Sequence, residues 1–577
     1  MSDAIQDVYP LAPGQGGILF QSLGEGAEGS GAYVVQVVLH LRGEPDRVRE
    51  RAAWDALVAR HDALRTALVW RGRARPLQVV GRRARAPFAL HDLTDLPQAE
   101  RAPRVAAFLA EDRARGFDLS RAPLLRLARF RLGGGEGRLV ASFHHAVLDG
   151  WSAPVLLREW LALYAGRPLP PARPFREHVA WALSQDRAAA LAFWRAELAD
   201  RAPAAVWTPP PPAAPPAARR GDLSLDLDAA QTQALRAAAR RAGVTLAVAA
   251  QGAWALTLSR LSGSRDVVWG LARSGRSAAL AGVESRAGMF LTTLPMRAQA
   301  DPDRPLADWL GEIQARLSAQ GPHEHLPLGE VQAAVGRPDG GPLLTSAVVF
   351  ENYPTDPALL GEVEGFAIEA AEVREQTSLP LTLFAAPHAS ADGQRLRLRL
   401  LFDAALVDEA VARLALSDAA RVLATLAEAP RTRLGEIALE AAPLAAPRAP
   451  APPLSKPLGE APQAAVARLL PRLAALWAEL LEGETPEAED NFFALGGHSL
   501  LTLRLQERIR ADLGIEVAVP DLFRFATLAA QSRHLAALRV AAETPDRPDG
   551  RAQARLQGAA RLRRRRAQTA PNGARHA

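Results

Sequence analysis

The chain has no cysteine in its 577 residues and only one lysine, Lys456. The absence of cysteine excludes disulfides, thiolate metal sites and cysteine nucleophiles. No run of about 18 apolar residues is free of charged side chains, and the starting segment MSDAIQDVYP lacks a basic stretch followed by an apolar one. We therefore expect a cytoplasmic protein without a membrane role.

Charge and length describe the rest of the composition. A chain of 577 residues with 48% hydrophobic residues is long enough for several packed domains. The net charge of +6 is largely local, because eight arginines lie between Arg551 and Arg575. Such a run is typical of a solvated, disordered arm, the alternative being contact with a partner or polyanion. We predict a disordered Arg-rich tail over residues 542–577 and no nucleic-acid function.

Proline-rich segments divide the chain. The stretch TPPPPAAPPAARRG, residues 208–221, favours a connecting loop, because proline fixes φ and supplies no amide donor. A stronger break follows at residues 440–463, where proline and alanine dominate without a hydrophobic period. The predicted organisation is a main domain over 1–440, a linker over 441–463 and a small domain over 464–541.

The stretch ASFHHAVLDGWS, residues 141–152, places two histidines ahead of an aspartate and a glycine. The preceding LLRLARFRL, GGGEG and RLVASFHH predict a β-hairpin whose second strand ends at the histidines. The following APVLLREWLALYAG predicts a helix that closes at Gly166. The histidine motif therefore lies on a loop between a strand and a helix.

The residues of this motif alone leave three interpretations open. The histidines could end a strand while the aspartate and glycine form a turn. A metal site is a second interpretation, but adjacent residues on a strand point to opposite faces, so only one histidine could join Asp149 as a ligand. The third is a general base, with one imidazole facing a cleft and the other buried.

Six stretches in chain order resemble the signature motifs of the condensation domains of nonribosomal peptide synthetases. HHAVLDGWS resembles the family's His-His-x-x-x-Asp-Gly signature. The other matching stretches are VYPLAPGQGGILFQSL, RHDALRT, GLARSGR, GVESRAGMFLTTLPMR, and HEHLPLGEVQ followed by VVFENYP. The resemblance covers roughly residues 5 to 440.

This resemblance implies an α+β fold of two lobes, each similar to chloramphenicol acetyltransferase, arranged in a V with a tunnel between them. The lobes would span about 1–175 and 176–440. His145 would be the active-site imidazole, acting as base or positioning group, and His144 would be structural. Asp149 would pair with Arg65, and Gly150 would let the backbone lie close to the substrate. No metal is implied.

A second signature lies in the small domain. DNFFALGGHSLLTLRLQERIR, residues 490–510, resembles the peptidyl carrier protein of the same synthetases, an all-α four-helix bundle. A lone Gly-Gly-His-Ser would suit an N-cap serine, but the resemblance implies that Ser499 carries covalent 4′-phosphopantetheine. Leu501 stands where the hydrolase elbow G-x-S-x-G has its last glycine, so the pattern fits a thioesterase poorly.

Together the two signatures imply an acyltransferase that forms an amide between a carrier-bound acyl or peptidyl thioester and an aminoacyl group. The only lysine lies in the linker, so no adenylation activity is expected. The implied partners are an upstream donor carrier, an adenylation domain in trans, a phosphopantetheinyl transferase, and a downstream module, thioesterase or tailoring enzyme. The alternatives are an acyltransferase of the same fold using a small free amine or alcohol, and a non-catalytic platform that recruits tailoring enzymes.

The sequence departs from the family pattern at two motifs. Gly14 and Gly16 replace larger residues in the opening motif, and Thr292 and Thr293 stand where the family usually has Asn-Thr. These differences bear on substrate selectivity rather than on the reaction. The opening motif also favours a donor that ends in a D-residue.

Overall fold

The computed structural model describes most of the chain. The described residues are 4–23, 31–71, 73, 75–198, 220–276, 279–335, 343–352, 361–441, 460–481, 483, 485–492, 495, 497, 499–517, 521–522 and 525–543. Most of the predicted proline-rich loop, most of the predicted linker and almost the whole predicted tail lie outside these residues, and the predictions for them stay predictions. The last four residues of the predicted linker, 460–463, are instead the first turn of a helix that begins at Glu460.

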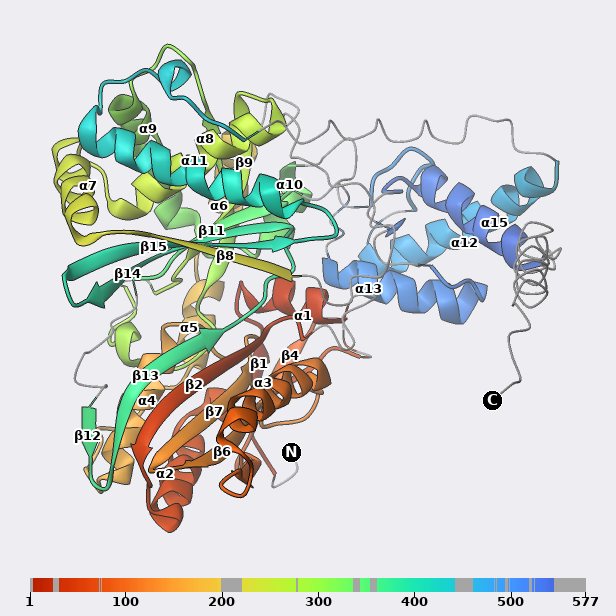
Figure 1. Ribbon diagram of the computed structural model, residues 1–577. Coiled ribbons are helices and arrows are strands. Elements are labelled where there is room, and N and C mark those ends of the chain that lie inside the picture. The colour runs from red at the N-terminus through yellow and green to blue at the C-terminus, as the bar shows by residue number, and fades with distance from the viewer. Residues whose placement is uncertain are drawn as a thin grey trace, which may run out of the picture.

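The N-terminal lobe is built on a six-stranded sheet with the order β12-β13-β2-β7-β6-β5 (Figure 1). In sheet order the strands are β12 (Gly361–Val363), β13 (Phe366–Arg374), β2 (Val34–Gly43), β7 (Glu136–His144), β6 (Leu125–Gly133) and β5 (Phe88–Asp92). Strands β6 and β7 form the predicted antiparallel hairpin. The helices of this lobe are α1 (Gln15–Leu23), α2 (Arg47–Arg60), α3 (Gln98–Arg115), α4 (Ser152–Tyr164) and α5 (Arg176–Leu183).

Helices cover both faces of this sheet. Successive residues of a strand point to opposite faces, so Phe143 of β7 packs with Leu57 of α2 and Trp160 of α4. Val140, from the other face of β7, packs with Leu109 of α3. A separate small sheet has the order β1-β4-β3. Its strands are β1 (Ile5–Pro10), β4 (Leu77–Gly81) and β3 (Thr66–Val69).

The C-terminal lobe has a second six-stranded sheet, with the order β10-β9-β11-β14-β15-β8. Its strands are β10 (Thr292–Gln299), β9 (Asp266–Arg273), β11 (Ser346–Phe350), β14 (Leu381–Ser390), β15 (Gly393–Asp403) and β8 (Arg220–Leu227). Its helices are α6 (Arg187–Leu198), α7 (Ala229–Arg241), α8 (Leu246–Ser262), α9 (Leu306–Gln320), α10 (Leu328–Val335) and α11 (Glu409–Glu428). Buried side chains of β14 and β15 pack against α7, α8 and α11 in the largest core of the chain.

The C-terminal part of the chain contributes the two strands β12 and β13 to the N-terminal sheet. β13 lies far along the chain, yet it pairs antiparallel with β2 of the N-terminal sheet, and the chain then returns to the C-terminal sheet as β14. Figure 1 shows β13 beside β2 in the lower lobe and β14 in the upper one. The predicted lobe limit near residue 175 therefore does not separate the two sheets along the chain.

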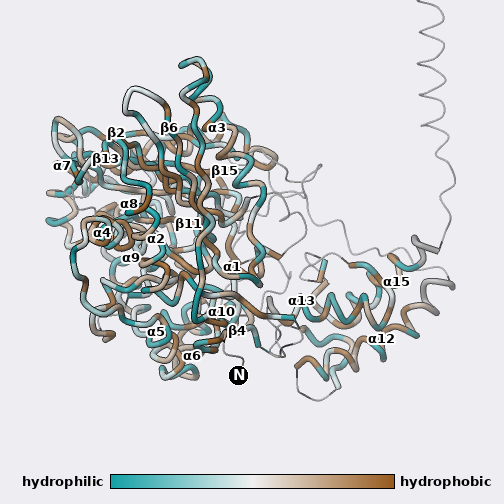
Figure 2. The backbone as a smooth tube through the Cα atoms, turned by 90° about the horizontal axis from the view of Figure 1, so that it is seen from below, coloured by the Kyte–Doolittle hydropathy of each residue, from teal (hydrophilic) through white to brown (hydrophobic). Residues whose placement is uncertain are grey.

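The small domain is helical. Its elements are α12 (Glu460–Leu481), α13 (Ser499–Arg508), a π-helical turn (Ile509–Leu513) and α15 (Leu528–Glu543). Trp477 and Phe492 meet edge to face at its centre, with ring centroids 5.0 Å apart. Figure 2 shows these helices as a group beside the two lobes, and α13 contacts α1 of the N-terminal lobe.

The length and composition of a helix decide whether it can span a bilayer. Within the described ranges, no single helix is long and apolar enough to cross a membrane. Helices α7 and α8 meet the criterion only as a pair bent by 96°.

Candidate active site

The histidine motif begins where β7 ends. The register of β7 with β2 runs as far as the pair Val34 and His144. His145 is the next residue, and its backbone N–H donates to the carbonyl oxygen of Tyr33 over 2.8 Å. The strand ladder thus fixes the backbone of both histidines, as the sequence predicted from the strand before them.

His144 is buried among neutral partners. Its Nε2 lies 3.3 Å from Oγ of Ser22, and its Nδ1 accepts from the backbone N–H of Ala146 over 3.2 Å. Burial, with a smaller contribution from His145, lowers the pKa of the His144 imidazole to about 3. His144 is therefore neutral at physiological pH, and its surroundings suit the structural role expected for it.

His145 is only half-buried and makes fewer contacts. Its Nδ1 is enclosed but has no hydrogen-bond partner among the described residues. The loop beyond it is anchored by Gln15, whose Nε2 donates to the carbonyl oxygen of Ala146 over 2.8 Å. An imidazole whose backbone is fixed and whose side chain is only half-buried can reach a substrate and exchange a proton with it.

Asp149 does not pair with Arg65, and that prediction is wrong. Its Oδ1 and Oδ2 instead lie 3.0 and 3.1 Å from Nη2 of Arg276, the last residue of the GLARSGR stretch. Both side chains are almost fully buried. The carboxylate also accepts from the backbone N–H and hydroxyl of Ser152 and from the backbone N–H of Phe290.

Arg65 is buried at a different place, under the small sheet. Its Nη1 donates to Oε1 of Gln6 over 2.6 Å and to the carbonyl oxygen of Gly81, and its Nε donates to that of Val58 over 3.2 Å. These acceptors hold Arg65 away from the motif loop. Its position suits a structural role, as expected, but beside the small sheet and not at the motif loop where the sequence placed it.

Gly150 and Gly14, two glycines of the motifs, differ in what the structure shows about the need for a glycine at each position. Gly150 is half-buried and is not among the described residues with positive φ. Its predicted role, close approach to a substrate, therefore rests on the missing side chain and stays a prediction. At Gly14, an added Cβ would lie 1.9 Å from the carbonyl oxygen of Leu291. The departure from the family pattern at Gly14 thus goes with close packing against the segment that precedes Thr292.

Tyr33 is a site residue that the sequence did not predict. It has φ of 60°, and no other non-glycine residue in the described part of the chain has a positive φ. Such backbone strain persists only where the surroundings enforce it. Besides accepting from His145, Tyr33 places its Oη 2.8 Å from Oγ of Ser378, between β13 and β14. No local pattern marked this residue, because both contacts are long-range.

Ser499 is the first residue of α13, as predicted. Just before it, Gly497 donates its N–H to the carbonyl oxygen of Phe492 over 2.8 Å, and an added Cβ there would lie 2.3 Å from the Phe492 ring. The first N–H groups of a helix lack intrahelical acceptors and suit a phosphate, so this position fits a phosphodiester on Ser499.

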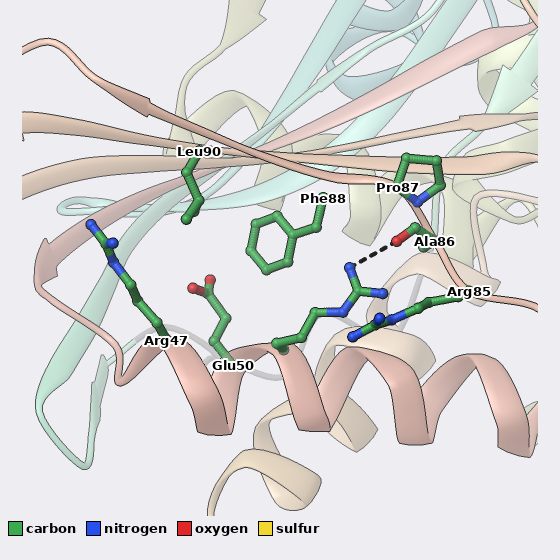
Figure 3. A pocket seen from close by; sticks show the side chains of 8 residues that line it. Arg47, Glu50, Arg85, Ala86, Pro87, Phe88 and Leu90 are labelled. Carbon is green, nitrogen blue, oxygen red and sulfur yellow. Dashed lines mark hydrogen bonds between the residues drawn. The ribbon is translucent and has the colours of Figure 1, made fainter.

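A pocket of about 430 Å³ lies elsewhere in the N-terminal lobe, between α2 and β5. Figure 3 shows Glu50 pointing from α2 toward Phe88, while Arg51 donates to the carbonyl oxygen of Ala86 over 2.9 Å. Burial raises the pKa of Glu50 to about 7. None of the predicted site residues lines this pocket.

Two protein families match the chain. Residues 5–442 match the condensation domain family, and residues 471–535 match the phosphopantetheine attachment site family. These ranges cover the two signatures identified in the sequence. Domains of the second family carry 4′-phosphopantetheine covalently.

The chain is also similar to large peptide synthetases. It is 36% identical over 454 residues to one subunit of linear gramicidin synthase of Brevibacillus parabrevis, covering 75% of this chain and 6% of that protein. Another subunit of the same synthase is 37% identical over 451 residues, covering 75% of this chain and 9% of that protein. The chain therefore spans a small fraction of these relatives.

Solved structures share the fold of the two lobes. The condensation domain of monacolin K polyketide synthase has a TM-score of 0.62 at 19% identity, covering 75% of this chain and all of that one. The X-domain from teicoplanin biosynthesis has a TM-score of 0.62 at 24% identity, covering 75% of this chain and 97% of that one. The predicted α+β class and two-lobed fold are confirmed.

Proposed function

The chain belongs to the condensation domain family, and from this premise we propose that it joins an acyl or peptidyl thioester to the amine of an aminoacyl group. The condensation domain would cover residues 1–440 and the carrier domain 464–541. In this proposal the chain is a condensation and carrier didomain of a nonribosomal peptide synthetase.

The observation that carries the proposal is the state of His145. Its backbone is fixed by Tyr33, the loop after it is closed by Asp149, and its Nδ1 has no partner among the residues the structure describes. A side chain whose backbone is held in place and which is only half-buried is available to a substrate. Its neighbour His144 has both ring nitrogens in contact with polar groups and is the structural member of the pair.

Amide formation sets two demands that this site addresses. The attacking nitrogen must lose protons, and the carbonyl passes through a tetrahedral state that bears an oxyanion. An imidazole with an ordinary pKa near 6.5 accepts a proton near neutral pH. Holding the two reactants together supplies a further part of the rate. His145 serves one or both purposes, and Gly150 leaves room beside it.

Ser499 is the proposed attachment point for 4′-phosphopantetheine, whose thiol holds an acyl group as a thioester. The serine begins α13, and the N-terminal turn of that helix can donate N–H groups to the phosphate. Helix α13 contacts α1, which also supplies Ser22 beside His144. This proximity supports a carrier that works with the lobes of its own chain.

The proposed partners follow from the two domains. A phosphopantetheinyl transferase modifies Ser499, and an adenylation domain in trans supplies the aminoacyl group. An upstream carrier protein brings the donor. A downstream module, a thioesterase or a tailoring enzyme receives the product.

The test is intact-protein mass spectrometry of the full chain. After incubation with coenzyme A and a phosphopantetheinyl transferase, the wild type should gain one phosphopantetheine arm and Ser499→Ala none. When the loaded aminoacyl chain is mixed with a peptidyl thioester on a separate carrier, the mass on Ser499 should grow by the peptidyl group. Loading without growth for every donor and acceptor pair tested would reject the condensation activity and keep the carrier assignment.

The same assay separates the two alternatives. An acyltransferase for a free acceptor would release its product when a small amine or alcohol is added, with no growth on Ser499. A recruitment platform would give no product with either acceptor. The platform is considered because the teicoplanin X-domain, which shares the fold, is also known in a complex with OxyB from that biosynthesis.

A further inference from the structure

Two glutamates near His145 have no role in the mechanism above. Glu375 directly follows β13, and Glu351 directly follows β11. Both are half-buried, and neither side chain forms a hydrogen bond or an ion pair with another described residue. Half-buried carboxylates without partners are uncommon in a packed interior, because a charge removed from water normally needs a counter-charge.

The strand register places Glu375 close to the histidines. Arg374, Gln36 and Ser142 lie in one row across β13, β2 and β7. Strands β13 and β7 run in the same direction, since each is antiparallel to β2. Glu375 therefore lies one row beyond Ser142, and His145 lies two rows further on. Consistent with this placement, the His145 imidazole opposes the rise in the pKa of Glu375.

Side-chain contacts fix the segment that carries Glu375. Oη of Tyr33 lies 2.8 Å from Oγ of Ser378, and Nη1 of Arg220 donates to the carbonyl oxygen of Leu379 over 3.0 Å. The carbonyl oxygen of Tyr33 also accepts from the backbone N–H of His145. The same tyrosine therefore contacts both the histidine motif and the segment that follows Glu375. The position of Glu375 relative to the imidazole is thus set by short contacts.

Glu351 approaches from the C-terminal sheet. Leu383 and Ala385 of β14 and Val348 of β11 belong to the core beneath the helices. Since side chains alternate along a strand, Glu351, three residues after Val348, lies on the face opposite those helices. Arg399 of β15 lies on the same face, because its neighbours in the strand belong to that core.

The charges on this face do not balance. The charge of Arg399 acts on both glutamates, but its Nη2 already lies 2.7 Å from Oδ2 of Asp222. The single positive charge of Arg399 thus acts on three carboxyl groups, those of Asp222, Glu351 and Glu375. Burial raises the pKa of both Glu351 and Glu375, and the charge of Glu375 raises that of Glu351 further. If both carboxyls ionised, their repulsion would be unfavourable, and a cation between them would relieve it and favour the ionised form.

We propose that Glu375 and Glu351 bind the ammonium group of the acceptor aminoacyl residue and present it to His145. The inference rests on the condensation function proposed above and adds the group that recognises the acceptor. The α-amine of an aminoacyl thioester is the cation that must reach His145, which favours this ligand over a metal ion. Neither glutamate was among the site residues expected from the sequence.

The two carboxylates also provide a place for the first proton. The bound ammonium gives one proton to a carboxylate, and the freed lone pair attacks the thioester carbonyl to form the C–N bond. The C–S bond then breaks, and the second proton lost by nitrogen passes by way of His145 to the leaving sulfur. One amide, one thiol and one protonated carboxyl result, and the carboxyl later returns its proton to water.

Calorimetric titration tests the binding step on the full chain without any reaction. The ligands are pantetheine amides that carry an alanyl group, a propionyl group without an ammonium, or a 6-aminohexanoyl group with a distant ammonium. The wild type should bind the alanyl compound about tenfold more tightly than the other two, a factor that corresponds to about 1.4 kcal/mol. Equal binding of all three, or preference for the distant ammonium, would overturn the proposal.

Glu375→Gln and Glu351→Gln should each reduce the preference for the alanyl compound severalfold and leave propionyl binding unchanged. Glu369→Gln is the matched control, because Glu369 is on β13 but forms an exposed ion pair with Arg42. If either Glu375→Gln or Glu351→Gln does not fold, the remaining variant still tests whether the preference for the alanyl compound is lost. A loss of affinity for alanyl and propionyl compounds alike would show that the glutamates support only the fold.

Single-turnover assays then connect binding with reaction. The acceptor on Ser499 is an aminoacyl group or the hydroxyacyl group with the same side chain, and the donor is a peptidyl thioester on a separate carrier. Glu375→Gln should slow amide formation at least about tenfold and change ester formation less than about twofold, since only the amine acceptor carries the cation. Equal slowing of both rejects the ammonium site. A wild type that makes neither product fails at the condensation function itself, while the calorimetric result still judges the ammonium site.

Discussion

Asp149 and Arg276 form a buried ion pair across 127 residues of sequence, with Oδ1 of Asp149 3.0 Å from Nη2 of Arg276. The aspartate belongs to the loop after His145, and the arginine belongs to the segment after β9. The guanidinium also donates to the carbonyl oxygens of Val283 and Arg286. The pair thus ties the motif loop of one lobe to the chain of the other.

Breaking this pair should destabilise the protein. Arg276→Met leaves a buried carboxylate without its counter-charge, which typically costs about 3–5 kcal/mol. The free energy of unfolding from urea titration measures the loss. Arg431→Met, which removes an exposed pair with Asp308, should change it by less than about 1 kcal/mol. If Arg276→Met melts like the wild type but is inactive, Arg276 contacts substrate instead.

Removing the His145 imidazole should slow amide formation and leave the fold intact. General-base assistance is typically worth about 10²–10⁴-fold, so His145→Ala should lose a factor in that range in single-turnover assays with a loaded Ser499. If proton removal dominates, the deficit should shrink as pH rises and more acceptor amine is neutral. If positioning dominates, the deficit should stay constant with pH. A wild-type rate in a folded, loaded variant contradicts the assignment.

Acid should weaken the N-terminal lobe through His144. Its folded pKa of about 3 lies below the ordinary value of 6.5, so between these values the unfolded chain binds a proton that the folded chain excludes. The free energy of unfolding should therefore fall as pH decreases through this window, by up to about 1.4 kcal/mol per pH unit. His144→Asn should flatten this part of the stability curve.

His178 offers a parallel to His144. Burial lowers its pKa to about 4, so His178→Asn should also flatten the curve, between about pH 4 and the ordinary value of about 6.5. Denaturant titrations at several pH values give both slopes. An unchanged slope in both variants would show that these imidazoles are protonated in the folded protein.

A rise in pH from acid to neutral should act through Glu50 with the opposite sign. Its folded pKa of about 7 lies above the ordinary value, because burial outweighs the attraction of Arg129 and Arg47. The folded chain holds a proton that the unfolded chain releases, so stability is full below about pH 4.5 and declines as pH rises to about 7. Glu50→Gln should stabilise the protein at about pH 8 by up to about 3 kcal/mol.

The control for Glu50 is a carboxylate of the same lobe outside the pocket. Glu44→Gln removes an exposed partner of Arg131 and should not reproduce the gain in alkali. At about pH 5 Glu50→Gln should match the wild type, because Glu50 is then protonated in the folded protein. A destabilised Glu50→Gln variant in alkali would mean that the carboxylate is charged and held by its arginines.

Local sequence patterns were sufficient to predict the helices and strands that carry the histidine motif and the Ser499 motif. The hairpin β6–β7, the helix α4 after the motif loop and the start of α13 at Ser499 were all predicted, and the structure confirms them. Alternation of side chains, turn residues and helix periodicity act over a few residues, so the sequence displays them directly. Alternation along the strand predicts only that the two histidines face opposite ways, and the family resemblance supplied which of them is the active imidazole.

Contacts between residues that are far apart in the sequence could not be predicted from local patterns. The sequence offers many arginines to Asp149, and only the folded chain selects Arg276 over Arg65. The position of Tyr33 between His145 and Ser378, and the return of β13 to the first sheet, depend on how two lobes pack. A charge pair or a strand pairing between distant parts of the chain is decided by distances in space, and the energies that select it arise from burial across the whole domain. The chemistry of the motifs was therefore fixed by the order of residues, while their partners were decided by the tertiary structure.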